Sequence, residues 1–176
     1  MNHNLTLKNT LVFTAIVTLL ICASLAWDYF HDGVPTHYLL HSKDLPGFSN
    51  WWGIVLIPAV TLYLLQRIRK RLTNNRTENL KQVIYRFLAA LGFGIVLSIL
   101  FLLGSDLPGI MMIGVIILSF FIRLYLPEYI LGNILGLVYT FGGVLPVIIS
   151  LVLLSIFVIT YSGIRKGILL IVARFR

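Results

Sequence analysis

The chain has 176 residues, of which 59% are hydrophobic and only 11% are charged, and its formal net charge is +8. A soluble domain carries about 25% charged residues, so this composition excludes a water-soluble globule and makes lipid the expected solvent. The single cysteine, Cys22, excludes an intrachain disulfide and a metal site made only of cysteines.

The first expected membrane span covers residues 10–27. Its apolar run follows Lys8 and ends in a small-x-small pattern at residues 24–26, as a signal peptide would. The run is longer than the usual apolar region of such a peptide. We therefore expect it to stay in the protein as a membrane helix.

A polar loop at residues 28–50 follows the first span and contains three of the four histidines. If the first helix continues past Trp27, helical spacing places Asp28, His31 and Asp32 on one face. A Gly/Pro turn then leads to His37 and His41, whose spacing predicts one face of a second short helix. These side chains form a nitrogen and oxygen set suited to zinc or another divalent metal.

Two other interpretations of this loop stay open. The same side chains would also form a metal-free proton or solute site, because imidazole titrates near neutral pH. They are equally typical of solvated residues that mark a membrane boundary. Asn50, Trp51 and Trp52, at the entry to the second span, and Asp106, from another outer turn, are candidate substrate contacts. For Asn50 or Ser49 the alternative is a helix N-cap, and for the tryptophans it is an interface anchor.

The second span covers residues 51–66, and the loop at residues 67–86 holds seven basic residues. Basic residues next to membrane spans stay on the cytoplasmic side. This places the N-terminus inside and the polar loop at residues 28–50 outside. The basic loop contains no recognisable nucleic-acid-binding module, so we expect no nucleic-acid partner.

The remaining spans are expected at residues 87–103 and 109–122, followed by a long apolar stretch at 128–162. As one helix this stretch would be about 50 Å long, well beyond a hydrocarbon core of about 30 Å. Two spans, at 128–141 and 146–162, with a turn at Gly142–Gly143, return the C-terminal basic residues to the cytoplasm. A re-entrant hairpin over the same stretch is the alternative.

The predicted fold is therefore an all-α polytopic membrane bundle of six spans. It forms one domain over residues 1–176, with both termini cytoplasmic, and we expect it in the bacterial inner (plasma) membrane. Gly132 and Gly136 allow close approach of two helix backbones. Packing within the chain is the expected use, and association with another chain is the alternative. Glu128 is expected to form an ion pair with Arg123.

The sequence lacks a P-loop, a dinucleotide fingerprint, a Gly-x-Ser-x-Gly elbow and a His-Glu-x-x-His zinc helix. The absence of an ionisable residue near a predicted midplane argues against an ion pump. Size, span number, termini and the outer loop are similar to the substrate-capture subunits of vitamin transporters of the energy-coupling type. This resemblance implies capture of a small solute from outside.

We therefore favour a binding or transport protein for a small solute or metal. The second possibility is a membrane enzyme that acts on a lipid or lipid-linked substrate at the outer leaflet. There a bound metal would activate water, with an Asp or His as general base. The third is a structural or assembly protein, whose main partner is the lipid bilayer.

Overall fold

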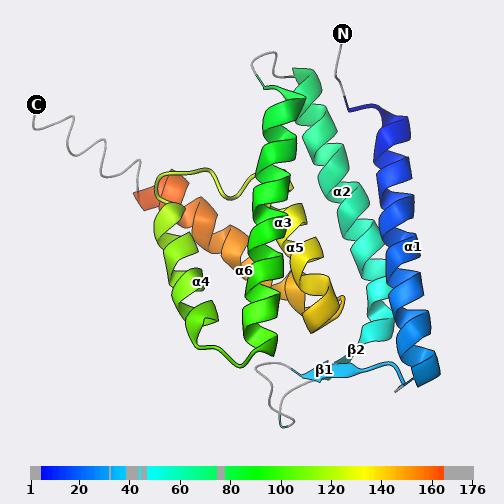
Figure 1. Cartoon of the computed structure of the whole chain (residues 1–176). Helices are drawn as coiled ribbons and strands as arrows, with labels where there is room; N and C mark the ends of the chain where they lie inside the picture. Colours follow the sequence, from blue (N-terminus) through cyan, green and yellow to red (C-terminus); the bar gives the residue numbers. More distant parts are fainter. Residues whose placement is uncertain (1–4, 32, 39–43, 45–46, 75–77, 165–176) are drawn as a thin grey trace, which may run out of the picture.

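The computed structural model of the chain describes residues 5–31, 33–38, 44, 47–74 and 78–164. Successive helices run in opposite directions and form one bundle (Figure 1). The helices are, in order, α1 (Leu7–His31), α2 (Gly53–Asn74), α3 (Leu80–Leu102), α4 (Leu107–Leu118), α5 (Pro127–Phe141) and α6 (Leu145–Val158). Shorter elements are the strands β1 (Thr36–Tyr38) and β2 (Gly47–Ser49), the 3-10 turn η2 (Asn50–Trp52) and the π-helical segment η3 (Ile159–Ile164).

Four described segments are long and apolar enough to cross a membrane, namely Leu7–His31, Asn50–Asn74, Leu80–Leu102 and Leu145–Gly163. They support the all-helical membrane protein expected from the sequence. The other two helices are shorter, with 12 residues in α4 and 15 in α5. At the helical rise per residue these two are about 18 and 22 Å long.

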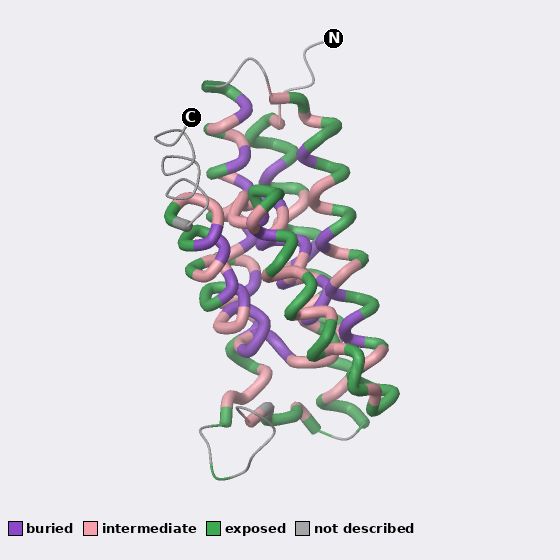
Figure 2. Tube along the Cα trace, turned by 90° about the vertical axis from the view of Figure 1, so that its left-hand side faces the viewer, coloured by how far each residue is buried: buried purple, intermediate pink, exposed green. Residues whose placement is uncertain are grey.

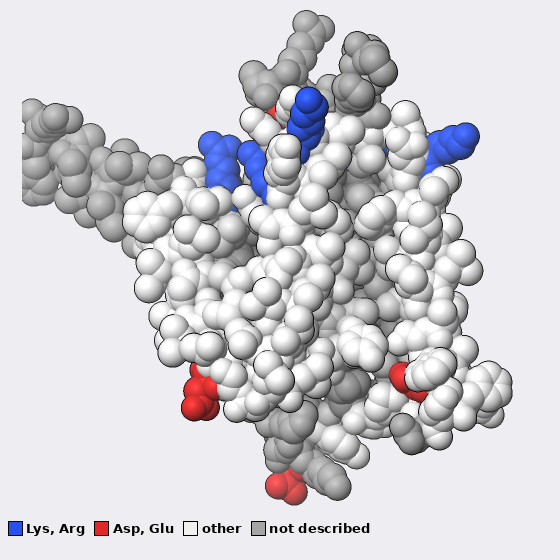
Figure 3. Space-filling model, in the orientation of Figure 1, with Lys and Arg blue, Asp and Glu red and all other residues white. Residues whose placement is uncertain are grey.

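Burial and charge are distributed over the bundle as expected for helices in a membrane. Buried residues lie along the faces where helices meet, whereas the outward faces are exposed (Figure 2). Many of the exposed side chains are large and apolar, as expected for contact with lipid tails. On the face shown in Figure 3, Lys and Arg lie at one end, most Asp and Glu lie at the other, and the surface between them is uncharged.

Helices α3 and α5 are in direct backbone contact. A Cβ atom on Gly136 would lie 2.7 Å from the carbonyl oxygen of Leu91, and one on Gly132 would overlap the carbonyl oxygen of Phe87. The Ser98 hydroxyl donates a 3.1 Å hydrogen bond to the carbonyl oxygen of Gly136. The expectation that both glycines face another helix of the same chain is thus confirmed.

The N-terminal end of α2 is fixed to the turn between α5 and α6. Gly142, with φ of 72°, ends α5, so the turn expected at Gly142–Gly143 is confirmed. A Cβ on Gly143 would overlap the Cα of Gly53. The side-chain oxygen of Asn50 accepts a 2.8 Å hydrogen bond from the backbone N–H of Gly143. Asn50 therefore joins two elements that are far apart in the sequence.

The segment between α1 and α2 contains a two-stranded antiparallel sheet in which His37 lies opposite Phe48. The prediction of a short helix containing His37 is therefore wrong. Pro35 disfavours the helical conformation in the residue before it. Thr36 and Tyr38, which follow, are residue types that favour strands.

Candidate functional site

A pocket of about 400 Å³ lies at one end of the bundle, between the last turn of α1 and residues 33–35. Asp28 and His31 line it from α1, together with the exposed ring of Trp27. Helix α1 ends at His31. Gly33, which follows shortly after, has φ of 81°, and its N–H donates a 2.8 Å hydrogen bond to the carbonyl oxygen of Asp28. Gly is the usual residue for this helix-ending geometry.

The imidazole of His31 is held by Trp27, one helical turn earlier. The two rings are stacked, with centroids 4.0 Å apart and planes 19° apart. Nδ1 of His31 lies 2.9 Å from the carbonyl oxygen of Trp27. A carbonyl oxygen only accepts, so the proton of a neutral ring sits on Nδ1 and the lone pair on Nε2. Metal-binding histidines commonly have this arrangement, because the carbonyl fixes the tautomer and the ring orientation.

The structure describes the positions of only some of the five predicted metal ligands. Continuation of α1 to His31 confirms the helical spacing of Asp28 and His31, and both line one pocket. Asp32 and His41 lie outside the described residues, as does the side chain of His37. Within the described part of the chain, no group of three or more His, Cys, Asp or Glu residues is placed to hold a metal. A complete metal site stays a prediction.

The predicted substrate contacts are distributed over the same end of the bundle as this pocket. The side-chain oxygen of Asn50 is used in the bond to Gly143. Trp51 and Trp52 are exposed, and Trp51 packs edge-to-face against Tyr29 at 6.3 Å. Asp106 precedes α4, whose start lies across the bundle from the end of α1 (Figure 1). None of these four residues lines the pocket beside Asp28.

Ser49 and Asn50 were both considered as helix N-caps, and the structure gives them different roles. Ser49 is the N-cap of η2, and its hydroxyl lies 3.5 Å from the backbone N–H of Trp51. The capping role expected for Ser49 or Asn50 therefore falls to Ser49. Asn50 contributes a tertiary hydrogen bond to Gly143, which could not be predicted from the sequence.

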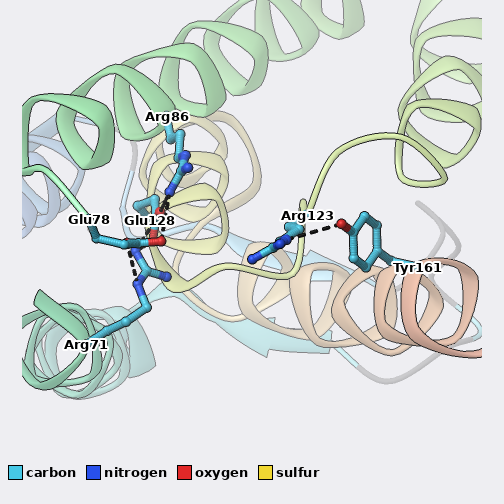
Figure 4. A network of polar contacts seen from close by, with 6 residues as sticks. All are labelled: Arg71, Glu78, Arg86, Arg123, Glu128 and Tyr161. Atoms are coloured by element: carbon cyan, nitrogen blue, oxygen red, sulfur yellow. Dashed lines mark hydrogen bonds and ion pairs between the residues drawn. The ribbon is translucent and has the colours of Figure 1, made fainter. Parts of the chain in front are cut away.

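The opposite end of the bundle contains a network of four charged side chains (Figure 4). Glu128, in the first turn of α5, is fully buried. Both of its carboxylate oxygens lie 2.8 Å from Nη2 of Arg71 on α2, and Oε1 lies 3.1 Å from Nη1 of Arg86 on α3. Glu78 completes the network, because its Oε2 is 2.8 Å from Nε of Arg71. Two cations and two anions leave this network without net charge.

The structural ion pair expected for Glu128 is confirmed, but its partners are Arg71 and Arg86 and not Arg123. Arg123 instead donates a 3.1 Å hydrogen bond from Nε to the hydroxyl of Tyr161 (Figure 4). That hydrogen bond raises the pKa of the Arg123 guanidinium above its ordinary value. Sequence analysis missed Arg71 and Arg86 as partners because seven basic residues occur in one segment, and sequence alone does not show which of them face α5.

Taken together, these features define an all-α protein with four helices long and apolar enough to cross a membrane, a pocket lined by Asp28 and His31 at one end and a charge-neutral ion network at the other. Comparison with protein-family models, curated proteins and solved structures found no match. The case for a function therefore rests on the geometry of the chain.

Proposed function

We propose that this protein binds a small polar solute or a divalent metal ion at its outer end, as a transport or substrate-capture subunit of the bacterial inner membrane. The observation that carries the proposal is the position of His31. Its ring is oriented by Trp27, its Nε2 is not used by the bond to the carbonyl, and it shares a pocket with Asp28.

The chemistry of this pair suits both classes of ligand. A neutral imidazole nitrogen and a carboxylate oxygen are typical ligands of zinc and other first-row divalent metals. For a metal, Asp32, His37 and His41 are the predicted additional ligands. For an organic solute, the Asp28 carboxylate would accept hydrogen bonds, and the exposed Trp27 ring would offer an apolar face.

The proposal includes six membrane crossings with both termini in the cytoplasm. Two features support it. Successive helices alternate in direction (Figure 1), and basic residues lie at the end of the bundle opposite the pocket (Figure 3). Basic residues mark the cytoplasmic side of membrane proteins. This orientation opens the pocket to the outside, where a capture subunit would meet its ligand.

Binding of Zn²⁺ to the purified full-length protein tests the proposal. Zinc content and affinity are measured by elemental analysis and titration calorimetry for wild type, His31→Ala and Asp28→Asn. The control is Asp106→Asn, which removes an outer carboxylate that does not line the pocket. Thermal unfolding in detergent checks that each variant is folded.

We expect His31→Ala and Asp28→Asn each to weaken zinc binding by about 10-fold or more, and Asp106→Asn to leave it unchanged. Occupancy should fall as the pH is lowered, since a protonated imidazole cannot bind metal. If wild type retains neither zinc nor any co-purified solute, or if both pocket variants bind as wild type does, the proposal fails.

A further inference from the structure

A second cavity, of about 240 Å³, lies among α3, α4, α5 and α6. Its lining is almost entirely apolar and includes Ala89, Phe93, Val115, Leu118 and Phe157. An apolar cavity of about 150 Å³ is already large enough to take up a benzene-sized molecule. This cavity therefore has room for a segment of hydrocarbon chain.

The cavity is located toward the basic end of the bundle. Its lining residues come from the middle of α3, the last turns of α4 and the first turns of α5. Leu124, in the connection between α4 and α5, and Tyr129 also line it. The start of that connection is joined to η3 by a buried 2.7 Å hydrogen bond between the hydroxyls of Ser119 and Thr160.

Arg123 immediately precedes Leu124, and its exposed guanidinium lies beside the rings of Tyr125 and Tyr161. Within the part of the chain that the structure describes, Arg123 forms one hydrogen bond, from Nε to Tyr161. Its two Nη groups form no hydrogen bond with any of these described residues. Arg123 thus differs from Arg71 and Arg86, whose charges are balanced by Glu78 and Glu128.

An apolar cavity beside a guanidinium that has no ion pair among the described residues is complementary to an anionic amphiphile. Arginine binds phosphate through paired N–H donors, and basic pockets between membrane helices bind lipid head groups on the cytoplasmic side. We propose that an anionic phospholipid binds here, with part of one acyl chain in the cavity and its phosphate on Arg123. This lipid site is separate from the outer pocket and does not depend on its function.

Native mass spectrometry of the delipidated full-length protein tests the site. Phosphatidylglycerol, which is anionic, is compared with phosphatidylcholine, which has the same acyl chains but no net charge. Inorganic phosphate is added in a separate arm to distinguish a lipid site from a simple phosphate site. The charge variant is Arg123→Gln, with Lys70→Gln as its control, because Lys70 is an exposed cation that does not line the cavity.

The cavity itself is tested by Ala89→Phe, which places a ring in the space that the acyl chain would fill. Its control is Ala59→Phe, the same change at an exposed position of α2 outside the cavity. Thermal unfolding in detergent confirms that the variants are folded. Because one variant removes charge and the other fills space, failure of either variant to fold leaves the other as a test.

We expect wild type to bind phosphatidylglycerol about 10-fold more tightly than phosphatidylcholine. Arg123→Gln should remove this preference, Ala89→Phe should weaken binding of both lipids, and the two controls should behave as wild type. Equal binding of both lipids by wild type would overturn the proposal. So would an equal loss in Lys70→Gln and Arg123→Gln, or displacement of the lipid by inorganic phosphate.

Discussion

Replacing Gly136 with alanine adds a single methyl group at the contact between α3 and α5. The new Cβ would lie 2.7 Å from the carbonyl oxygen of Leu91 and 2.9 Å from the Cα of Gly94. Both neighbours are backbone atoms, so the helices themselves would have to separate. Overpacking of this kind costs about 1–3 kcal/mol. Alanine is intrinsically better than glycine within a helix by about 1 kcal/mol, which offsets part of that cost.

Gly92→Ala is the matched control, because Gly92 lies on α3 and a Cβ there would meet nothing within 4 Å. The Gly92→Ala variant gains the higher helix propensity of alanine without a steric clash. The two variants should therefore differ in free energy of unfolding by about 1–3 kcal/mol. For a chain of this size this corresponds to midpoints roughly 3–10 °C apart.

Thermal unfolding in detergent, followed by circular dichroism, measures both variants. Gly136→Leu should be less stable than Gly136→Ala because it adds more volume to the same contact. Equal midpoints for Gly136→Ala and Gly92→Ala would refute the backbone contact between α3 and α5. That result would mean that Gly136 faces lipid.

Two further predictions concern the ion network and the topology. Glu128→Gln should lower the free energy of unfolding by about 3 kcal/mol, because it leaves two arginines beside a buried neutral amide, whereas Glu78→Gln should cost less because that side chain is 17% exposed. A larger loss for Glu78→Gln in denaturant titrations would contradict the central position of Glu128. In a Cys22→Ser background, a membrane-impermeant thiol reagent should label Gly33→Cys from outside and should not label Leu170→Cys. Labelling of Leu170→Cys would mean an odd number of crossings.

The positions of the helices could be predicted from the sequence, but their ends could not. Apolar runs show only the part of a helix that contacts lipid. The second span was expected to end at residue 66, yet α2 continues to Asn74 through the basic segment. Lys and Arg are good helix formers, so their positive charge does not end a helix.

Contacts between distant segments could be predicted only where a residue pattern is typical of one kind of contact. The spacing of Gly132 and Gly136 was sufficient, because small residues four positions apart allow helices to approach. Many basic residues were possible partners for Glu128, and the actual partners depend on which faces of α2 and α3 are directed toward α5. At the outer pocket, spacing predicted that Asp28 and His31 share a face. The bond from His31 to the Trp27 carbonyl depends on a side-chain rotamer, which spacing does not determine.

The short helices have a consequence for the surrounding bilayer. Helix α4 lies on one side of the molecule and α1, with 25 residues, lies on the other (Figure 1). The hydrocarbon core of a typical membrane is about 30 Å thick, close to the reach of α1 but well beyond the roughly 18 Å of α4. Such a mismatch is relieved by local thinning of the bilayer, at a fraction of a kcal/mol per Å. We expect the membrane to be thinner beside α4 than beside α1, so short-chain lipids should gather along one side of the protein and long-chain lipids along the other.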